Sequence, residues 1–252
     1  MLDQTTIAQL RALRLQGFAD AFQQQLAQPE LHAMSFEERL ALLVDRAVNN
    51  RADRKRARLL NDAQLKFPEA TIENADFADI SGLDRKTLTS LALSGWVERG
   101  DTILFCGATG LGKTWLACAL AQYACRHGHS ALFLRMPRLA EELRVLHGSG
   151  SFGKWLLQLA KIDVLVLDDW GTGTLDPGMR NDLLEIIDDR AARKATIITH
   201  QLPVEHWHGW IGDATIADAM LDRLLQREHR FALEGDSRRT GKKSPATRRK
   251  TA

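Results

Sequence analysis

The sequence predicts an α/β fold in which a central parallel sheet is flanked by helices and preceded by a small helical N-terminal domain. From about residue 100 onward, short apolar runs alternate with longer helical segments, which is the pattern of βαβ units. The first 70 residues instead repeat apolar side chains at three- and four-residue steps, as amphipathic helices do. A glycine-rich string between one apolar run and one helical segment is a third indication of this class.

The helical N-terminal domain is predicted to cover residues 1–70. One helix ends near Pro29, and its apolar face comprises Leu15, Phe18, Phe22 and Leu26. A second helix begins at a capping box of Ser35 and Glu38, and its apolar face comprises Phe36, Leu40, Leu43 and Ala47. Five cations between residues 51 and 58 form either a solvated helix face or a contact to nucleic acid.

The second predicted domain, residues 71–239, carries the alternating strand and helix pattern. Its expected strands are short apolar runs at residues 102–106, 131–135, 164–167, 196–199 and 230–233. The helices expected between them cover residues 113–126, 137–146, 177–190 and 215–227. Residues 240–252 are polar and basic, so we expect a disordered tail there.

Composition and charge narrow the possible partners. The 252 residues are 44% hydrophobic, which is enough for a sizeable core. No run approaches the ~20 apolar residues that span a bilayer, and the first residues lack a signal-peptide pattern, so we expect a cytoplasmic protein without a membrane partner. The segment after Gly235 contains seven basic residues and one acidic residue, so its net charge is +6. Since the whole chain has a net charge of +2, residues 1–235 carry −4. The tail is therefore a basic arm suited to nucleic acid.

A phosphate-binding loop is the strongest motif in the sequence. An apolar run at residues 103–106 precedes it and a helix-forming segment follows it, as this motif requires. Its backbone N–H groups are expected to surround the phosphates of ATP, with Lys113 on the β- and γ-phosphates and the Thr114 hydroxyl on Mg²⁺. The cofactor-binding residues are Gly107, Ala108, Thr109, Gly110, Leu111, Gly112, Lys113 and Thr114.

Two carboxylates end the apolar run at residues 164–167, in the position of a Walker-B strand. Asp168 is expected to hold Mg²⁺ through its water shell, since this ion prefers oxygen ligands and keeps several waters. Asp169 is then placed to orient or polarise the attacking water. A carboxylate at that second position favours hydrolysis over transfer to a bound small molecule.

Four strings, in this order and spacing, resemble one family: GATGLGKTWLACALAQYAC, VLVLDDWGTG, TIITHQLPVEHWHGWIGD and ATIADAMLDRLLQREHRFALEGDSRR. Together they are similar to the IstB family of insertion-sequence transposition helper ATPases, an AAA+ group related to the DnaC helicase loaders. The resemblance covers nearly the whole chain apart from its last dozen residues. It implies an AAA+ P-loop NTPase fold.

The resemblance also implies roles for residues outside the two Walker motifs. Gln201 falls in the sensor-1 region, although the family commonly has Ser where this chain has His200. Arg223 matches the arginine finger that one AAA+ subunit supplies to its neighbour; without the resemblance, a solvated helix arginine is the simpler interpretation. Arg239 matches the sensor-2 arginine by register, and the adjacent Arg238 leaves open which of the two points inward.

The function implied is an ATP-dependent helper of transposition. ATP binding would drive self-assembly on duplex DNA without sequence specificity, the assembly would recruit and stimulate a partner transposase, and hydrolysis would dismantle it. A DnaC-like loader of a replicative helicase is the alternative. A P-loop kinase for a metabolite is a weaker one, because it explains neither Arg223 and Arg239 nor the basic tail. Whether the N-terminal helices bind DNA or the transposase stays open.

Overall fold

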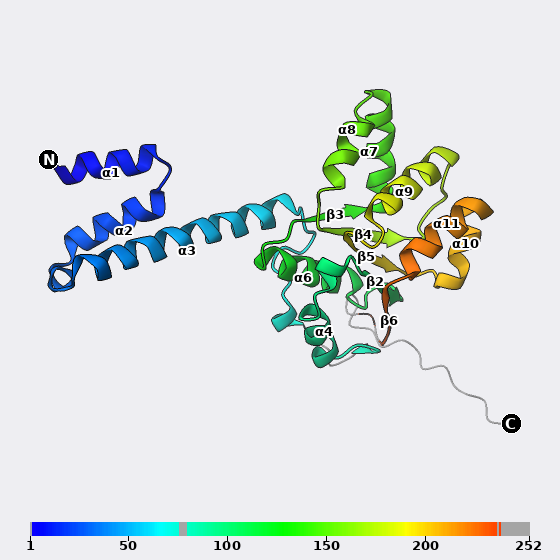
Figure 1. Ribbon diagram of the computed structural model, residues 1–252. Coiled ribbons are helices and arrows are strands. Elements are labelled where there is room, and N and C mark those ends of the chain that lie inside the picture. The colour runs from blue at the N-terminus through cyan, green and yellow to red at the C-terminus, as the bar shows by residue number, and fades with distance from the viewer. Residues whose placement is uncertain (1, 76–79, 236, 238–252) are drawn as a thin grey trace. The chain divides into compact units, whose positions relative to one another are not determined.

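A computed structural model describes residues 2–75, 80–235 and 237 of the chain (Figure 1). The chain divides into two compact units, residues 1–58 and residues 59–252. The basic tail predicted at residues 240–252 lies outside the described residues. Among the helices that the structure describes, none combines the length and the apolar character needed to cross a membrane.

The first unit is entirely helical in its described part. Its elements are α1 (Leu2–Ala12), α2 (Gln16–Ala27), the short 3-10 helix η1 (Pro29–Ala33) and α3 (Phe36–Asp62), which continues past the unit boundary. The predicted capping box is present at the start of α3, because the Ser35 N–H donates to Glu38 Oε2 at 2.9 Å and the Glu38 N–H donates to Ser35 Oγ at 3.2 Å.

The apolar face predicted on α3 is only partly covered in the structure. Leu43 is buried and Ala47 is partly buried, but Phe36 is 70% exposed and Leu40 is 38% exposed. Periodicity identifies a helix face that could be buried; whether a neighbour covers it depends on tertiary packing.

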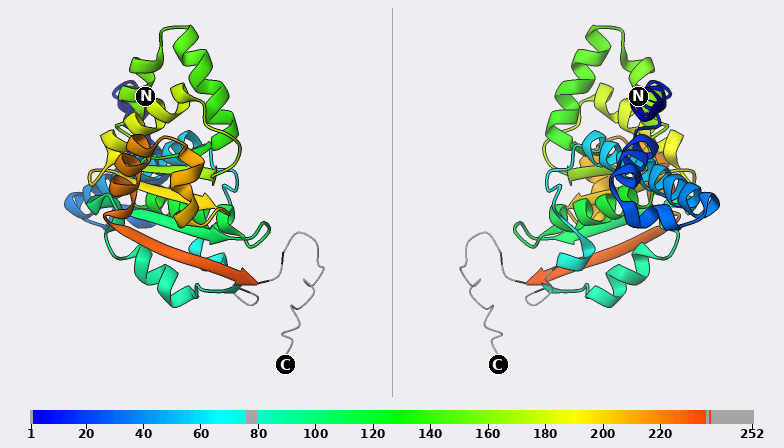
Figure 2. Two further views of the ribbon diagram at one scale, coloured as in Figure 1. Left: turned by 90° about the vertical axis from the view of Figure 1, so that its right-hand side faces the viewer. Right: turned by 90° about the vertical axis from the view of Figure 1, so that its left-hand side faces the viewer.

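A six-stranded sheet organises the second unit, in the order β1-β6-β2-β5-β4-β3. The strands are β1 (Ile80–Ser81), β2 (Thr102–Gly107), β3 (Ala131–Arg135), β4 (Val164–Trp170), β5 (Ala195–His200) and β6 (Glu228–Gly235). Strands β2 to β6 run parallel, and only β1 pairs antiparallel, at the end of β6. Figure 2 shows β6 as a long strand at the lower side of this sheet. The predicted parallel sheet is confirmed.

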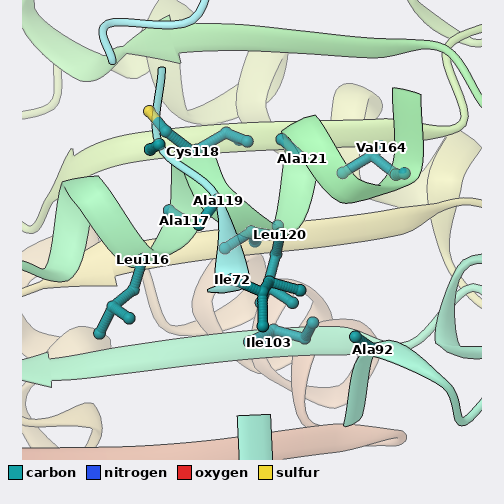
Figure 3. Packing of buried hydrophobic residues seen from close by; sticks show 14 of the residues in the cluster. Ile72, Ala92, Ile103, Leu116, Ala117, Cys118, Ala119, Leu120, Ala121 and Val164 are labelled. Carbon is teal, nitrogen blue, oxygen red and sulfur yellow. The ribbon is translucent and has the colours of Figure 1, made fainter. Parts of the chain in front are cut away.

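Helices cover both faces of the sheet. They are η2 (Ile72–Asn74), α4 (Arg85–Ala92), α5 (Trp96–Arg99), α6 (Lys113–Arg126), α7 (Met136–Gly148), α8 (Phe152–Leu159), α9 (Pro177–Arg190), η3 (Val204–His206), α10 (Trp207–Ile211) and α11 (Ala214–Leu225). Successive strand residues point to opposite faces, so Ile103 and Val164 pack with α6 and α4 (Figure 3), whereas Leu104 and Leu165 pack with α7 to α11. Residues that alternate in sequence thereby supply two cores.

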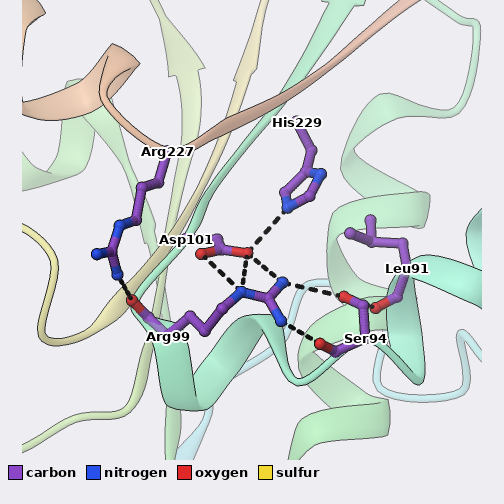
Figure 4. Close-up of polar contacts among 6 residues, drawn as sticks. All are labelled: Leu91, Ser94, Arg99, Asp101, Arg227 and His229. Carbon is purple, nitrogen blue, oxygen red and sulfur yellow. Dashed lines mark hydrogen bonds and ion pairs between the residues drawn. The ribbon is translucent and has the colours of Figure 1, made fainter.

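An ion cluster joins β2 to β6 where both strands begin (Figure 4). The buried Asp101 carboxylate accepts hydrogen bonds from Arg99 Nε at 3.1 Å and from His229 Nε2 at 2.9 Å. Burial by itself would raise the pKa of Asp101, but the hydrogen bonds from Arg99 and His229 outweigh it and hold the pKa below its ordinary value. The charged form of Asp101 therefore stabilises the pairing of these two strands.

Arg190 is buried at the amino end of the sheet, where a charged side chain requires partners. Its guanidinium donates to the Ala195 carbonyl at 2.6 Å, to the Ile162 carbonyl at 2.9 Å and to Thr196 Oγ1 at 3.3 Å. Burial lowers the pKa of Arg190 to about 10, so the side chain stays charged at neutral pH. It connects α9 to the chain entering β4 and β5.

Replacing Arg190 with alanine should destabilise the second unit by roughly 2–5 kcal/mol, because it leaves buried carbonyl groups unpaired and opens a cavity. Urea unfolding followed by tryptophan fluorescence measures this, since all 6 tryptophans lie after residue 58. Arg193→Ala is the matched control, because Arg193 is exposed three residues beyond the end of α9 and its loss should change stability by less than about 0.5 kcal/mol. Equal unfolding midpoints for the two variants would contradict the structural role of Arg190.

Candidate active site

The phosphate-binding loop connects the carboxyl end of β2 to the first turn of α6. Gly107 has φ +147°, and a Cβ there would lie 2.4 Å from the Leu233 carbonyl oxygen of β6. Gly110 has φ +92°, and a Cβ there would lie 2.1 Å from Ser237 Oγ. Both positions therefore need glycine, for the backbone conformation and for the close approach of β6 at Gly107 and of Ser237 at Gly110.

Lys113, the first residue of α6, lies within this loop. It is 8% exposed, and its ammonium donates to the carbonyl oxygens of Gly107 at 2.7 Å and Ala108 at 2.8 Å. These bonds hold the positive charge over the loop, beside the N-terminus of α6, where the helix dipole also favours an anion. The loop, the helix end and the lysine together suit a polyphosphate.

Asp168 lies directly across from the start of α6. Its Oδ1 accepts hydrogen bonds from Thr114 Oγ1 at 2.7 Å and from Thr199 Oγ1 at 2.6 Å. Its Oδ2 is buried without a hydrogen-bond partner among the described residues, and Lys66 Nζ lies 3.9 Å from it. A buried carboxylate oxygen of this kind beside a threonine hydroxyl fits Mg²⁺, which takes few protein oxygens and relies on water and phosphate for the rest.

The two successive carboxylates reach the same region because β4 is irregular at this point. In a regular strand, Asp168 and Asp169 would point to opposite faces. The pairing register shifts between Leu167 and Trp170, and Asp169 has φ +62°, which is unusual for a residue other than glycine. The Asp169 N–H donates to Thr199 Oγ1 at 3.2 Å, so one hydroxyl group contacts both aspartates. Such irregularities redirect side chains near functional sites.

Arg135 ends β3 and forms an ion pair with the second carboxylate. Arg135 Nε lies 2.6 Å from Asp169 Oδ2, and this hydrogen bond raises the pKa of the arginine. The partnership follows from the parallel pairing of β3 with β4, which sets Arg135 opposite Asp168. Sequence reasoning identified Arg135 only as the end of a strand.

Gln201 follows β5 and reaches the phosphate-binding loop, because Thr109 Oγ1 donates to Gln201 Oε1 at 2.8 Å. The preceding residue, His200, is buried and turned elsewhere: its Nδ1 lies 2.7 Å from the Leu202 carbonyl and its ring packs edge-on against Trp207. Burial lowers the pKa of His200 below its ordinary value. Of this pair, Gln201 is the residue that lines the cavity.

A cavity of about 470 Å³ contains these groups. It also has an aromatic side, formed by Phe67 from the loop after α3 and Trp115 from α6, with Lys66 and Thr172 nearby. A lining that combines a loop for phosphates with aromatic side chains suits a nucleotide. Sequence reasoning did not identify these four residues, although a lysine and an aromatic residue before Pro68, and a tryptophan directly after Thr114, were visible signals.

Arg223 lies outside this cavity. Its Nη1 donates to the Ala219 carbonyl at 2.9 Å, and its Nε pairs with Asp188 of α9. Strand β6 begins soon after Arg223, and its first residue, Glu228, pairs with Thr102 at the amino end of β2. The phosphate-binding loop leaves the other end of that strand, about 17 Å away at ~3.3 Å per residue. Arg223 is therefore remote from the cavity of its own chain.

The predicted sensor-2 arginine, Arg239, and its neighbour Arg238 lie outside the described residues. The described residue that precedes them most closely in sequence is Ser237, which lies against Gly110 of the phosphate-binding loop.

Three tryptophans near the site form a packed cluster. Trp170 and Trp207 are fully buried with ring centroids 5.5 Å apart, and Trp210 Nε1 donates to the Gly173 carbonyl at 2.7 Å. Trp170 also packs edge-on against Trp210. They hold β4 against α10, so these tryptophans act as packing residues.

Comparison with known proteins agrees with the site. The family model of the IstB-like ATP binding proteins matches residues 8–246. The chain is 50% identical to "Insertion sequence IS1162 putative ATP-binding protein" of Pseudomonas fluorescens over 203 residues, which are 81% of this chain and 88% of that protein. It is 42% identical to "Putative insertion sequence ATP-binding protein y4pL" of Sinorhizobium fredii, covering 95% and 97% of the two chains.

Among solved structures, the DnaC helicase loader has a similar fold. The TM-score is 0.53 at 20% identity, and the match covers 66% of this chain and 97% of that one. At this identity the likeness concerns the fold alone. The sequence relatives and the phosphate-binding loop lead to one conclusion: the chain belongs to the IstB-like ATP-binding proteins of insertion sequences.

Proposed function

We propose that this protein hydrolyses ATP with Mg²⁺ and, in the ATP-bound state, assembles on duplex DNA to recruit and stimulate a partner transposase. The observation that carries the proposal is the pair of carboxylates at the end of β4. Asp168 lies against Thr114, the position that suits a metal, while Asp169 enters the nucleotide cavity. A site that only bound ATP would not need the second carboxylate.

The residues divide the hydrolytic work between them. Mg²⁺, held by Thr114 and Asp168, would neutralise charge on the β- and γ-phosphates. Lys113 contributes a second positive charge at the same phosphates. Asp169 orients the attacking water. Gln201, which follows β5 and accepts a hydrogen bond from Thr109 of the loop, can contact the γ-phosphate or that water. Most of the catalytic effect comes from positioning and charge, since phosphoryl transfer needs little covalent chemistry from the protein.

Self-assembly would bring Arg223 of one subunit to the nucleotide cavity of the next. Because Arg223 is remote from its own cavity, it can stabilise the transferring phosphate only in a neighbouring subunit. Arg239 would act in its own subunit instead, and the position of Ser237 against Gly110 supports that assignment, since the chain reaches the loop two residues earlier. ATP would then lie at the contact between subunits and control both assembly and disassembly.

Duplex DNA is the proposed surface for assembly, and its contacts are phosphate contacts. Five exposed cations follow one another along the second half of α3: Arg51, Arg54, Lys55, Arg56 and Arg58. Phosphate contacts carry no sequence information, so binding should be non-specific. The insertion-sequence names of the relatives favour transposition over helicase loading, and a transposase is therefore the proposed protein partner.

Assembly can be tested by electron microscopy of the full chain with long duplex DNA. We expect ordered assemblies with a non-hydrolysable ATP analogue, transient ones with ATP and none with ADP. Adding the transposase of the same insertion sequence to each sample should give co-sedimentation only with the assembled form. Assemblies that form equally without nucleotide would contradict the proposal, as would assembly that never needs duplex DNA.

Removal of the tail after residue 239 should weaken DNA binding most at low salt. For every phosphate that the tail no longer neutralises, the slope of log affinity against log salt should flatten by about 0.9, and the tail carries 5 cations between residues 242 and 250. Affinity measured across a salt series for the full and truncated chains tests this. A chain with these five residues changed to glutamine separates charge from length. Equal slopes for all three proteins would show that the tail does not contact DNA.

A further inference from the structure

We propose that Asp188 is a positioning residue that holds Arg223 ready for the active site of a neighbouring subunit. The inference rests on the proposed function, because it assumes that Arg223 acts in trans. The assignment comes from the contacts of the Arg223 guanidinium, which is anchored at two separate points on its own chain.

The two anchors come from different helices. Asp188, in the last turn of α9, pairs with Nε of Arg223, and the carbonyl of Ala219, one turn earlier in α11, accepts from Nη1 at 2.9 Å. A guanidinium has five N–H donors in a planar fork. Anchors at Nε and at Nη1, which face different edges of that plane, fix its orientation, and within the described residues no contact engages Nη2. The free end of the fork is the part that could reach a phosphate oxygen.

The setting of the pair explains why the anchor is rigid. Helices α9 and α11 pack against one another through the core, with Leu183, Ile187 and Leu224 buried. Both helices end at the amino edge of the sheet, where β5 and β6 begin. Asp188 is therefore held by a packed helix and not by a loop, which suits a group that must place another within a fraction of an ångström.

A purely structural role explains the pair less well. The Arg223 side chain is 33% exposed and the Asp188 side chain is 56% exposed. Ion pairs this accessible to water contribute little to folding stability. An arginine side chain has many rotamers, however. If the ion pair restricts Arg223 to one rotamer before assembly, the conformational entropy of that side chain need not be lost during the reaction. The main effect of the ion pair is therefore to orient the Arg223 guanidinium, not to stabilise the fold.

Asp188→Ala should lower the maximal rate of ATP hydrolysis on DNA by roughly 10- to 100-fold, the range expected for a misplaced catalytic group, without changing ATP affinity. Asp188→Glu, which keeps the carboxylate, should restore part of the rate. Asp189→Ala is the matched control, because Asp189 is the next acid on the same helix and is also exposed. Thermal unfolding of all three variants should stay close to that of the parent chain.

Mixed assemblies distinguish a positioning role from general damage. Asp188→Ala subunits mixed with Asp169→Asn subunits should regain activity, because an intact cavity then meets an intact Arg223 at some contacts. Asp188→Ala mixed with Arg223→Ala should regain none, since both changes affect the same side of the contact. Normal activity of Asp188→Ala beside an inactive Arg223→Ala would overturn this inference alone. Normal activity of Arg223→Ala would instead overturn the trans-acting arginine of the proposed function.

Discussion

Replacing Lys113 with alanine should nearly abolish ATP binding and, with it, assembly on DNA. The ammonium lies within the phosphate-binding loop, where it donates to the Gly107 and Ala108 carbonyls. Its loss would remove the charge-assisted hydrogen bonds that we propose it makes to the phosphates of ATP. Bonds of that type contribute about 1.5–3 kcal/mol each, which corresponds to a loss of roughly 10- to 100-fold in affinity for every bond. Calorimetric titration with ATP and Mg²⁺ measures the effect directly.

Lys154→Ala is the control for the loss of a lysine, because Lys154 is exposed on α8 and does not line the nucleotide cavity. Circular dichroism should show that both variants keep the fold of the parent chain. If a folded Lys113→Ala chain bound ATP with unchanged affinity, the nucleotide site would have to lie elsewhere.

Arg223→Ala should bind ATP normally but hydrolyse it on the order of 10³-fold more slowly on DNA, which is the effect of removing an arginine finger in related chemistry. Asp169→Asn should also bind Mg·ATP and lose turnover, because the water loses its carboxylate while Asp168 still holds the metal. Neither variant is active alone, yet a mixture should regain activity at contacts that join an intact cavity to an intact arginine. Steady-state phosphate release across mixing ratios measures the recovery.

Arg227→Ala is the matched control for that experiment. Arg227 lies four residues after Arg223 near the same edge of the sheet and donates to the Arg99 carbonyl at 3.2 Å. Its loss should leave hydrolysis within about twofold of the parent chain, in line with the small effects of most surface substitutions. A complete absence of recovery at every mixing ratio would argue that each subunit completes its own site.

The parts of this protein that the sequence predicted correctly are those in which the signal is local. The phosphate-binding loop is one continuous segment, so its glycines, its lysine and the helix after it can be interpreted together. The five parallel strands are short apolar runs between helices, and each run falls within the strand that the structure contains. Asp168 and Asp169 adjoin one of those runs, so their position at a strand end followed directly.

Two other residues lie in the site only because their strands are neighbours of β4 in the sheet. Arg135 meets Asp169 because β3 pairs with β4, and Thr199 meets both aspartates because β5 lies on the other side of β4. These partners are 30 and 34 residues from Asp169 in sequence. No local pattern predicts that neighbourhood, because adjacent strands lie ≈ 4.8 Å apart whatever their separation along the chain.

By itself, then, the sequence determined the class of fold, the phosphate-binding loop and the carboxylates at the end of β4, since each depends on the order of residues within one segment. Tertiary structure decided which face of α3 is covered, that Phe67 lines the nucleotide cavity, and that Asp188 pairs with Arg223. Those features depend on which segments pack together. Packing is selected by the free energy of the whole core, to which every buried side chain contributes, and no single segment contains that information.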